Sequence, residues 1–94
     1  MRLSKAEIKN LLHSIHSLDP AAKTYLFGSR TRDDIKGGDI DIAVHSSRLT
    51  LLDKVAIKQQ FFKEFGEQKI DILLVKDPEQ FFWKTIQEHA ILLV

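Results

Sequence analysis

The chain has 94 residues, 44% hydrophobic and 29% charged, a size and composition that predict one domain over residues 1–94. The net charge of +1 lacks the basic excess of a stand-alone nucleic-acid binder, so we expect no direct nucleic-acid partner. The absence of cysteine excludes disulfides and thiolate metal sites, and no apolar run suits a signal peptide or the ~20 residues of a membrane helix, so we expect a cytoplasmic protein without membrane association.

The chain begins with a predicted helix over residues 4–17, where apolar side chains recur at helical spacing. Ser4 with Glu7 three residues later fits a capping box at its start. Asp19-Pro20 ends the helix because the residue before a proline avoids the helical region.

A short strand and a turn follow this helix. Residues 24–27 are rich in β-formers and predict a strand, which Gly28 ends. Residues 29–34 predict a short helix or turn that the Ser29 hydroxyl is able to cap. Residues 39–44 alternate polar and apolar side chains, which predicts a second strand.

The second half predicts a helix, a strand, a helix and an apolar tail. Residues 51–65 form the helix, which ends at Gly66, and residues 69–75 form the strand. Pro78 opens a last helix that runs to about residue 89, and residues 90–94 predict a final short strand or a docking tail. The apolar side chains near one face of the long helix are Leu51, Leu52, Val55, Phe62 and Phe65. The element order predicts an α/β (α+β) fold with a small mixed β-sheet of three to four strands flanked by helices.

Three aspartates lie on the predicted strands. Asp39 and Asp41 would share one strand face, with Cα atoms roughly 6.5–7 Å apart, and Asp71 joins that face if its strand is adjacent. Like charges roughly 5 Å apart repel by about 3 kcal/mol at an effective dielectric near 20, so gathered carboxylates favour a divalent cation. Oxygen ligands suit magnesium or manganese, and metals bridged by carboxylates suit nucleotidyl transfer. Asp71 is then a general base or a metal ligand.

The turn ahead of these aspartates carries groups that bind anions. Gly28 is able to take a positive φ, which lets a phosphate approach the backbone closely. The Ser29 hydroxyl and the amides that follow would donate hydrogen bonds to that phosphate. Arg30 and Arg32 would add charge-assisted hydrogen bonds to phosphate oxygens. We therefore predict that these four residues bind a nucleoside triphosphate.

Gly28-Ser29, a spacer, Asp39-Ile40-Asp41 and the later Asp71 resemble the nucleotidyltransferase superfamily of DNA polymerase beta. The short length resembles its minimal nucleotidyltransferase (MNT) branch. The resemblance implies a polymerase-beta-like mixed sheet, with two magnesium ions as cofactors and ATP as substrate. It further implies that the Gly-Ser pair binds the triphosphate, that Asp39 and Asp41 ligate magnesium, and that Asp71 is the third carboxylate.

The resemblance also implies a partner, because many minimal members are encoded beside a HEPN-domain ribonuclease toxin. We therefore expect a Mg-dependent nucleotidyltransferase that transfers AMP from ATP to the HEPN toxin, acts as its antitoxin and forms a hetero-oligomer with it. The alternative is a non-catalytic antitoxin that neutralises the toxin by binding. A small-molecule nucleotidyltransferase of the aminoglycoside type is less favoured, since those relatives usually carry a further acceptor domain. The aromatic residues 81–83 predict core packing or, with residues 91–94, a partner surface.

Overall fold

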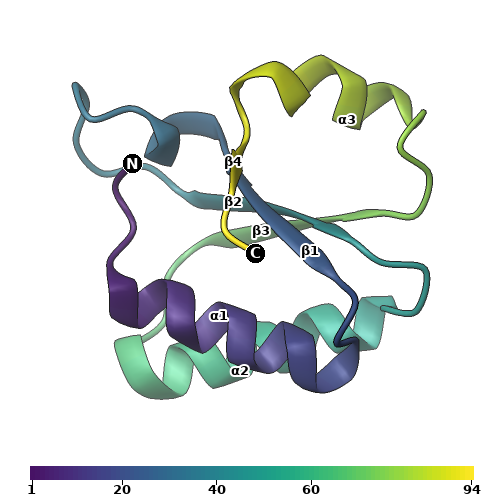
Figure 1. Cartoon of the computed structure of the whole chain (residues 1–94). Helices are drawn as coiled ribbons and strands as arrows, with labels where there is room; N and C mark the ends of the chain where they lie inside the picture. Colours follow the sequence, from purple (N-terminus) through teal and green to yellow (C-terminus); the bar gives the residue numbers. More distant parts are fainter.

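The computed structural model describes all residues from 1 to 94 and shows a four-stranded sheet between two layers of helices (Figure 1). None of the helices is long and apolar enough to cross a membrane. The elements in chain order are α1 (Lys5–Leu18), β1 (Lys23–Phe27), the 3-10 turn η1 (Gly28–Thr31), β2 (Ile40–His45), α2 (Leu51–Phe65), β3 (Ile70–Val75), α3 (Phe81–Ile86), the 3-10 turn η2 (Gln87–His89) and β4 (Ile91–Leu92).

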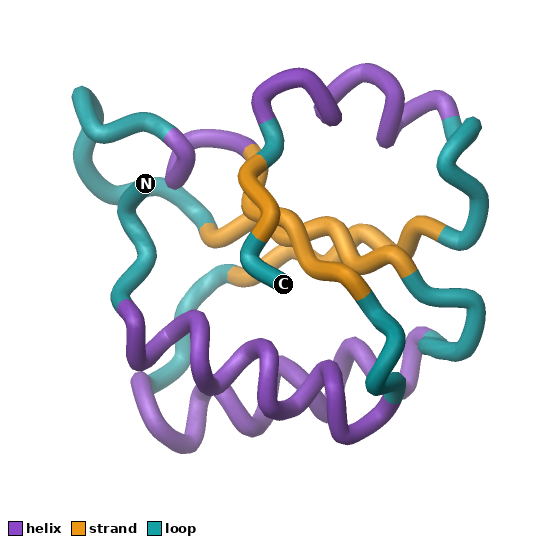
Figure 2. The backbone as a smooth tube through the Cα atoms, in the orientation of Figure 1, coloured by secondary structure: helices purple, strands orange, loops and turns teal.

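The sheet has the order β3-β2-β1-β4. Strands β2 and β3 are parallel, whereas β1 is antiparallel to both β2 and β4. The mixed sheet confirms the predicted fold class. The tail at residues 90–94 forms the final short strand through β4. In the backbone trace, α1 and α2 lie together on one face of the sheet and α3 covers the other (Figure 2).

The two faces of the sheet bury different sets of side chains, because successive strand residues point to opposite faces. The main core lies between the sheet and the α1–α2 layer and contains Ile42, Val44 and Ile72. A smaller cluster on the other face joins Ala43 and Val75 to Trp83 of α3. The face under α3 therefore holds the odd-numbered residues of β2 and β3, which include two of the predicted aspartates.

Both long helices begin at capping boxes. Ser4 and Glu7 exchange side-chain and backbone hydrogen bonds at the start of α1, as predicted. Thr50 and Asp53 make the same exchange at the start of α2, where no capping box was predicted. Gly66 ends α2 with a φ of 85°, which confirms its predicted position at the helix C-terminus.

The predicted apolar face of α2 is wrong in its first half. Leu51 and Leu52 are 74% and 80% exposed, and Val55 is also exposed, whereas Ile57 and Phe61 are fully buried. At 100° per residue, the three exposed residues lie on the side of the helix opposite Ile57 and Phe61. The helix therefore presents apolar side chains on two sides, and only one of them faces the core.

The last helix is shorter than predicted. Pro78 does not open it; the residue lies in a turn in which Asp77 accepts hydrogen bonds from two later amides. The Asp77 carbonyl binds Gln80 N at 2.9 Å, and its side chain binds Glu79 N at 2.9 Å. Aspartate competes with helical hydrogen bonds in this way, so α3 begins only at Phe81.

The aromatic run at residues 81–83 divides between the two predicted roles. Trp83 is buried and packs edge-on against His45, with ring centroids 4.3 Å apart. Burial lowers the pKa of His45, which favours the neutral ring. Phe81 and Phe82 remain 85% and 51% exposed. Only the two phenylalanines are therefore available to a partner.

Candidate active site

The carboxylates of Asp41 and Asp71 come together under α3, on neighbouring strands. The two residues are register partners in the parallel pairing of β2 with β3. Neighbouring strands lie about 4.8 Å apart, and both side chains leave the sheet on the same face. The sequence therefore predicted this pair correctly, on the condition that the two strands were adjacent.

The pair is electrostatically strained. Burial raises the pKa of Asp41 above its ordinary value, and the negative charges of Asp71 and Asp39 raise it further. The positive charge of Lys69 opposes the shift but does not cancel it. A bound cation would relieve the repulsion, and carboxylate oxygens are the donors that magnesium prefers.

Asp39 does not share the strand with Asp41, and this part of the sequence prediction is wrong. Strand β2 begins at Ile40, and the Asp39 carboxylate turns toward Lys69, with Oδ2 3.5 Å from Nζ. No group of three His, Cys, Asp or Glu side chains in the chain is placed to hold a metal ion. Two of the three predicted carboxylates meet, and the third lies in the preceding loop.

Gly28 lies against the carboxylate of Asp41. Its φ is 74°, and a methyl group on its Cα would overlap with Oδ2 of Asp41. The contact arises because Phe27, the last residue of β1, is the register partner of Asp41 on β2. Only glycine fits this position, for reasons of both space and backbone conformation.

Ser29 follows Gly28 in η1, but its hydroxyl does not cap that turn, contrary to expectation. Gly38 packs on the Ser29 side chain so closely that a methyl group at Gly38 would overlap with the hydroxyl oxygen. Gly38 therefore lets the loop pass directly against the Ser29 side chain. Triphosphate binding by Gly28 and Ser29 stays a prediction.

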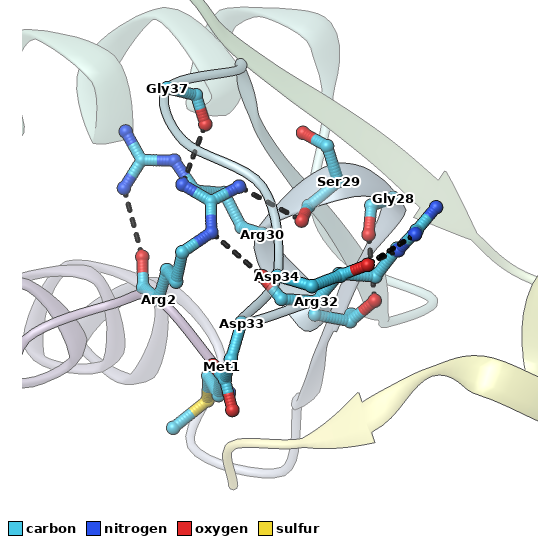
Figure 3. Close-up of polar contacts among 10 residues, drawn as sticks. Met1, Arg2, Gly28, Ser29, Arg30, Arg32, Asp33, Asp34 and Gly37 are labelled. Carbon is cyan, nitrogen blue, oxygen red and sulfur yellow. Dashed lines mark hydrogen bonds and ion pairs between the residues drawn. The ribbon is translucent and has the colours of Figure 1, made fainter.

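The two arginines of the turn make internal contacts (Figure 3). Arg30 donates hydrogen bonds to the carbonyl oxygens of Gly38 at 3.2 Å and Arg2 at 2.8 Å. Arg32 donates two to the carboxylate of Asp34, at 3.0 and 2.6 Å. This pairing lowers the pKa of Asp34 and raises the pKa of Arg32. Nη2 of Arg30 and Nη1 of Arg32 take no part in these contacts, and phosphate binding by the two arginines stays a prediction.

Arg2 is a site residue that the sequence reasoning missed. Its guanidinium donates to the carbonyl oxygens of Ser29 at 2.9 Å, Arg32 at 2.7 Å and Gly37 at 2.7 Å (Figure 3). The planar five-donor group of arginine suits this three-way contact. No local pattern marks Arg2, because its partners lie about 30 residues away along the chain.

Phe27 lines two grooves near the carboxylate pair. The groove on the β1 side has a volume of about 570 Å³, and its lining includes Gly28, Arg32 and His89. The groove on the β3 side has a volume of about 340 Å³. It is lined by Phe27, Asp41, Lys54, Lys58, Asp71, Ile72, Leu73 and Phe82. Both carboxylates line only the second groove, and the first is linked to Asp41 through Gly28.

Paired carboxylates beside a glycine turn on a small mixed sheet define a class of nucleotide-handling α/β domains. The family model described as Polymerase beta, Nucleotidyltransferase matches residues 7–94. The chain therefore belongs to this nucleotidyltransferase family, which confirms the superfamily resemblance and supports a transferase-type function. No curated protein matches the chain.

Proposed function

We propose that the protein is a Mg-dependent nucleotidyltransferase that transfers AMP from ATP to a hydroxyl group of a partner protein in the cytoplasm. The observation that carries the proposal is the Asp41–Asp71 pair held against Gly28 on adjacent strands. Its partner would be a HEPN-domain toxin, and the modification would make this chain the antitoxin of a minimal nucleotidyltransferase pair.

The residues present fit magnesium. Asp41 and Asp71 supply carboxylate oxygens, and their mutual repulsion favours a cation between them. Asp39 would join them by leaving Lys69, and both side chains of that ion pair are well exposed. Exposed ion pairs contribute only about 0–1 kcal/mol, so the exchange is inexpensive. When bound, the metal would lower the pKa of the attacking hydroxyl and neutralise the charge on the phosphates.

The chain's own residues would position the reactants and move the proton. Gly28 and Ser29 would hold the triphosphate by backbone amides and the hydroxyl. The acceptor oxygen attacks the α-phosphorus, and the bond from this phosphorus to the oxygen bridging to the β-phosphate breaks. Pyrophosphate leaves with that electron pair. The carboxylate of Asp71 takes the proton of the acceptor hydroxyl and passes it to water.

A second function deserves its own test, namely neutralisation of the toxin by binding alone. It is favoured by the exposed apolar side chains of Leu51, Leu52 and Phe81, which no element of this chain covers. In that case the nucleotidyltransferase fold would act as a scaffold, and the carboxylates would be dispensable for protection.

Label transfer tests the proposal. The purified chain is incubated with ATP labelled at the α-phosphate, magnesium and the HEPN protein encoded beside it. We expect the label on the HEPN protein, and a loss of about 100-fold or more in rate for Asp41→Asn and Asp71→Asn. Glu88→Gln, a surface carboxyl outside the site, should keep the wild-type rate. No label on the partner, together with no binding of ATP, would reject the enzyme.

Cell protection separates the two functions. Asp41→Asn with Asp71→Asn is expressed with the toxin, and the complex is isolated from the same cells. Catalysis predicts that protection disappears while the complex persists. Protection by the double variant would instead show that binding suffices.

A further inference from the structure

We propose that the groove on the β3 side of the Asp41–Asp71 pair binds the acceptor, and that Lys54 and Lys58 select an acceptor hydroxyl presented by an acidic polypeptide segment. This inference rests on the proposed transfer of a nucleotide and names the substrate class for its second site. It assigns a role to two lysines of α2 that the sequence reasoning did not single out.

The sheet order separates a triphosphate side from an acceptor side. Gly28 follows β1, on one side of β2, whereas Asp71 lies on β3, on the other side. Strands β1 and β3 are two spacings apart, about 10 Å, which leaves separate room on each side of Asp41. The proposed base, Asp71, must lie beside the acceptor hydroxyl. Asp71 lines two grooves, and only the one of about 340 Å³ also contains Asp41, so the acceptor enters through that groove.

The lysines of this groove have no carboxylate partner. Lys54 and Lys58 line the groove together with Asp41 and Asp71, yet neither lysine forms an ion pair. Of the nearby lysines, only Lys69 acts on the charge of Asp41, and it also pairs with Asp39. The formal charges of the two carboxylates and the two ammonium groups that line the groove sum to zero. Once a cation neutralises the carboxylates, the groove becomes positive and favours an anionic occupant.

The position of the lysines on α2 explains how they reach the sheet edge. Lys58 lies four positions after Lys54, so the two side chains lie on one side of the helix. Strand β3 is the outer strand of the sheet, and it pairs only with β2. The lysines of α2 therefore extend past this free edge toward the face that carries Asp71.

The apolar walls of the groove indicate a polypeptide rather than a nucleic acid. Phe82 is half exposed and packs edge-on against Phe27, with ring centroids 6.2 Å apart. Exposed apolar side chains continue beyond the groove, at Phe81 on α3 and at Leu51, one turn before Lys54. The net charge of +1 lacks the basic excess that favours binding to a phosphate backbone. An aromatic hydroxyl residue flanked by carboxylates matches both the rings and the lysines.

Peptide binding tests the inference. Short fluorescent peptides carry one tyrosine flanked by glutamates, by lysines or by serines, and anisotropy is measured with magnesium and a non-hydrolysable ATP analogue. We expect the glutamate peptide to bind at least about tenfold more tightly than the other two. Lys54→Glu with Lys58→Glu should remove this preference. Lys5→Glu with Lys9→Glu is the matched control, because it reverses two exposed lysines at the same spacing on α1.

The affinity for the ATP analogue distinguishes this inference from the proposed function. We expect the Lys54→Glu, Lys58→Glu protein to bind the analogue within about twofold of wild type. A loss of about tenfold or more would place the lysines on the triphosphate and overturn the acceptor assignment. Equal binding of the three peptides, no peptide binding, or a preference for an oligothymidylate would also overturn it. Failure of the wild type to bind the ATP analogue at all would instead reject the nucleotidyltransferase itself.

Discussion

At the scale of one residue, Asp41 lies where its negative charge lowers the stability of the fold. Its carboxylate is partly buried, faces Asp71 and has Gly28 pressed against it. Burial and the charge of Asp71 both disfavour the charged form of Asp41, and no hydrogen-bond donor of the chain compensates for them. A group with this surplus of negative charge is arranged for a cation, not for the fold alone.

The substitution Asp41→Asn should therefore stabilise the metal-free protein. The folded-state pKa of Asp41 is raised above its unfolded value, so the folded state binds more protons as the pH passes between the two values. Ionisation of Asp41 consequently lowers the free energy of unfolding as the pH rises through that window. At neutral pH the free energy of unfolding is lowered by the full amount. We expect the Tm of Asp41→Asn at pH 7, in EDTA, to exceed that of wild type by roughly a few degrees.

The gain should shrink as the pH falls from the raised folded-state pKa toward the ordinary carboxyl pKa, and it should be absent below that value, where wild-type Asp41 is protonated in both states. Circular dichroism melts between about pH 4 and pH 8 measure this difference. Glu88→Gln controls for the loss of one surface charge, since Glu88 is exposed and makes no ion pair. A Tm for Asp41→Asn at or below wild type at pH 7 would contradict the strain at this site.

The sequence predicted the positions of Asp41 and Asp71 correctly because their residue type is unusual in the secondary-structure element that contains them. Aspartate is depleted in strands, so Asp41 and Asp71 were conspicuous there. The contacts of Asp39 and Arg30 were not predictable, because their partners Lys69 and Arg2 lie about 30 residues away. The tertiary structure determines which groups the side chains of a loop contact, and the periodicity of the sequence does not predict these contacts.

At the scale of elements, periodicity located the helices and strands but misjudged two of their properties. Apolar side chains occur on two sides of α2, and hydrophobicity alone does not tell which side packs on the sheet. Asp77 forms hydrogen bonds that compete with a helix, so α3 begins three residues after Pro78. The first error depends on how α2 packs on the sheet, which the sequence of the helix alone does not contain. The second is local, since Asp77-Pro78 favours a turn.

The loop between β1 and β2 provides the prediction at this scale. Arg2 holds three carbonyl oxygens of that loop, so Arg2→Met should release it while β2 stays paired with β3. We expect faster amide hydrogen exchange over residues 28–38 and an affinity for ATP–Mg that is weaker by about tenfold, or about 1.4 kcal/mol. Exchange in β3 should be unchanged.

Two further variants test whether the guanidinium group of Arg2 is responsible for these effects. Arg2→Lys should recover only part of the affinity, because one ammonium group lacks the planar fork that spans separate acceptors. Arg48→Met removes an exposed arginine that donates no side-chain hydrogen bond, and it should leave both measurements at wild-type values. Slow exchange over residues 28–38 in Arg2→Met would show that the loop is organised without the arginine.

At the scale of the whole molecule, the sheet order explains how 94 residues combine two binding sides. Central strand β2 carries Asp41, β1 delivers the glycine turn to one side of it, and β3 delivers Asp71 to the other. A domain of this size buries only roughly 60–65% of its unfolded surface, and several large apolar side chains remain outside. A partner chain that covers Leu51 and Phe81 would complete both the surface and the acceptor site.

Magnesium links the local strain at the carboxylates to the stability of the whole domain. The ion binds Asp41 and Asp71 only where the folded sheet places them in register, so it should raise the Tm of wild type when ATP is present. A ligand at about 100 times its Kd adds about 2.7 kcal/mol to the free energy of unfolding. Asp71→Asn should lose the magnesium-dependent rise, whereas Glu88→Gln should keep it. Sodium chloride at matched ionic strength separates binding from charge screening. An unchanged wild-type Tm with millimolar magnesium and ATP would mean that the paired carboxylates hold no metal, and the strain at Asp41 would then need another cause.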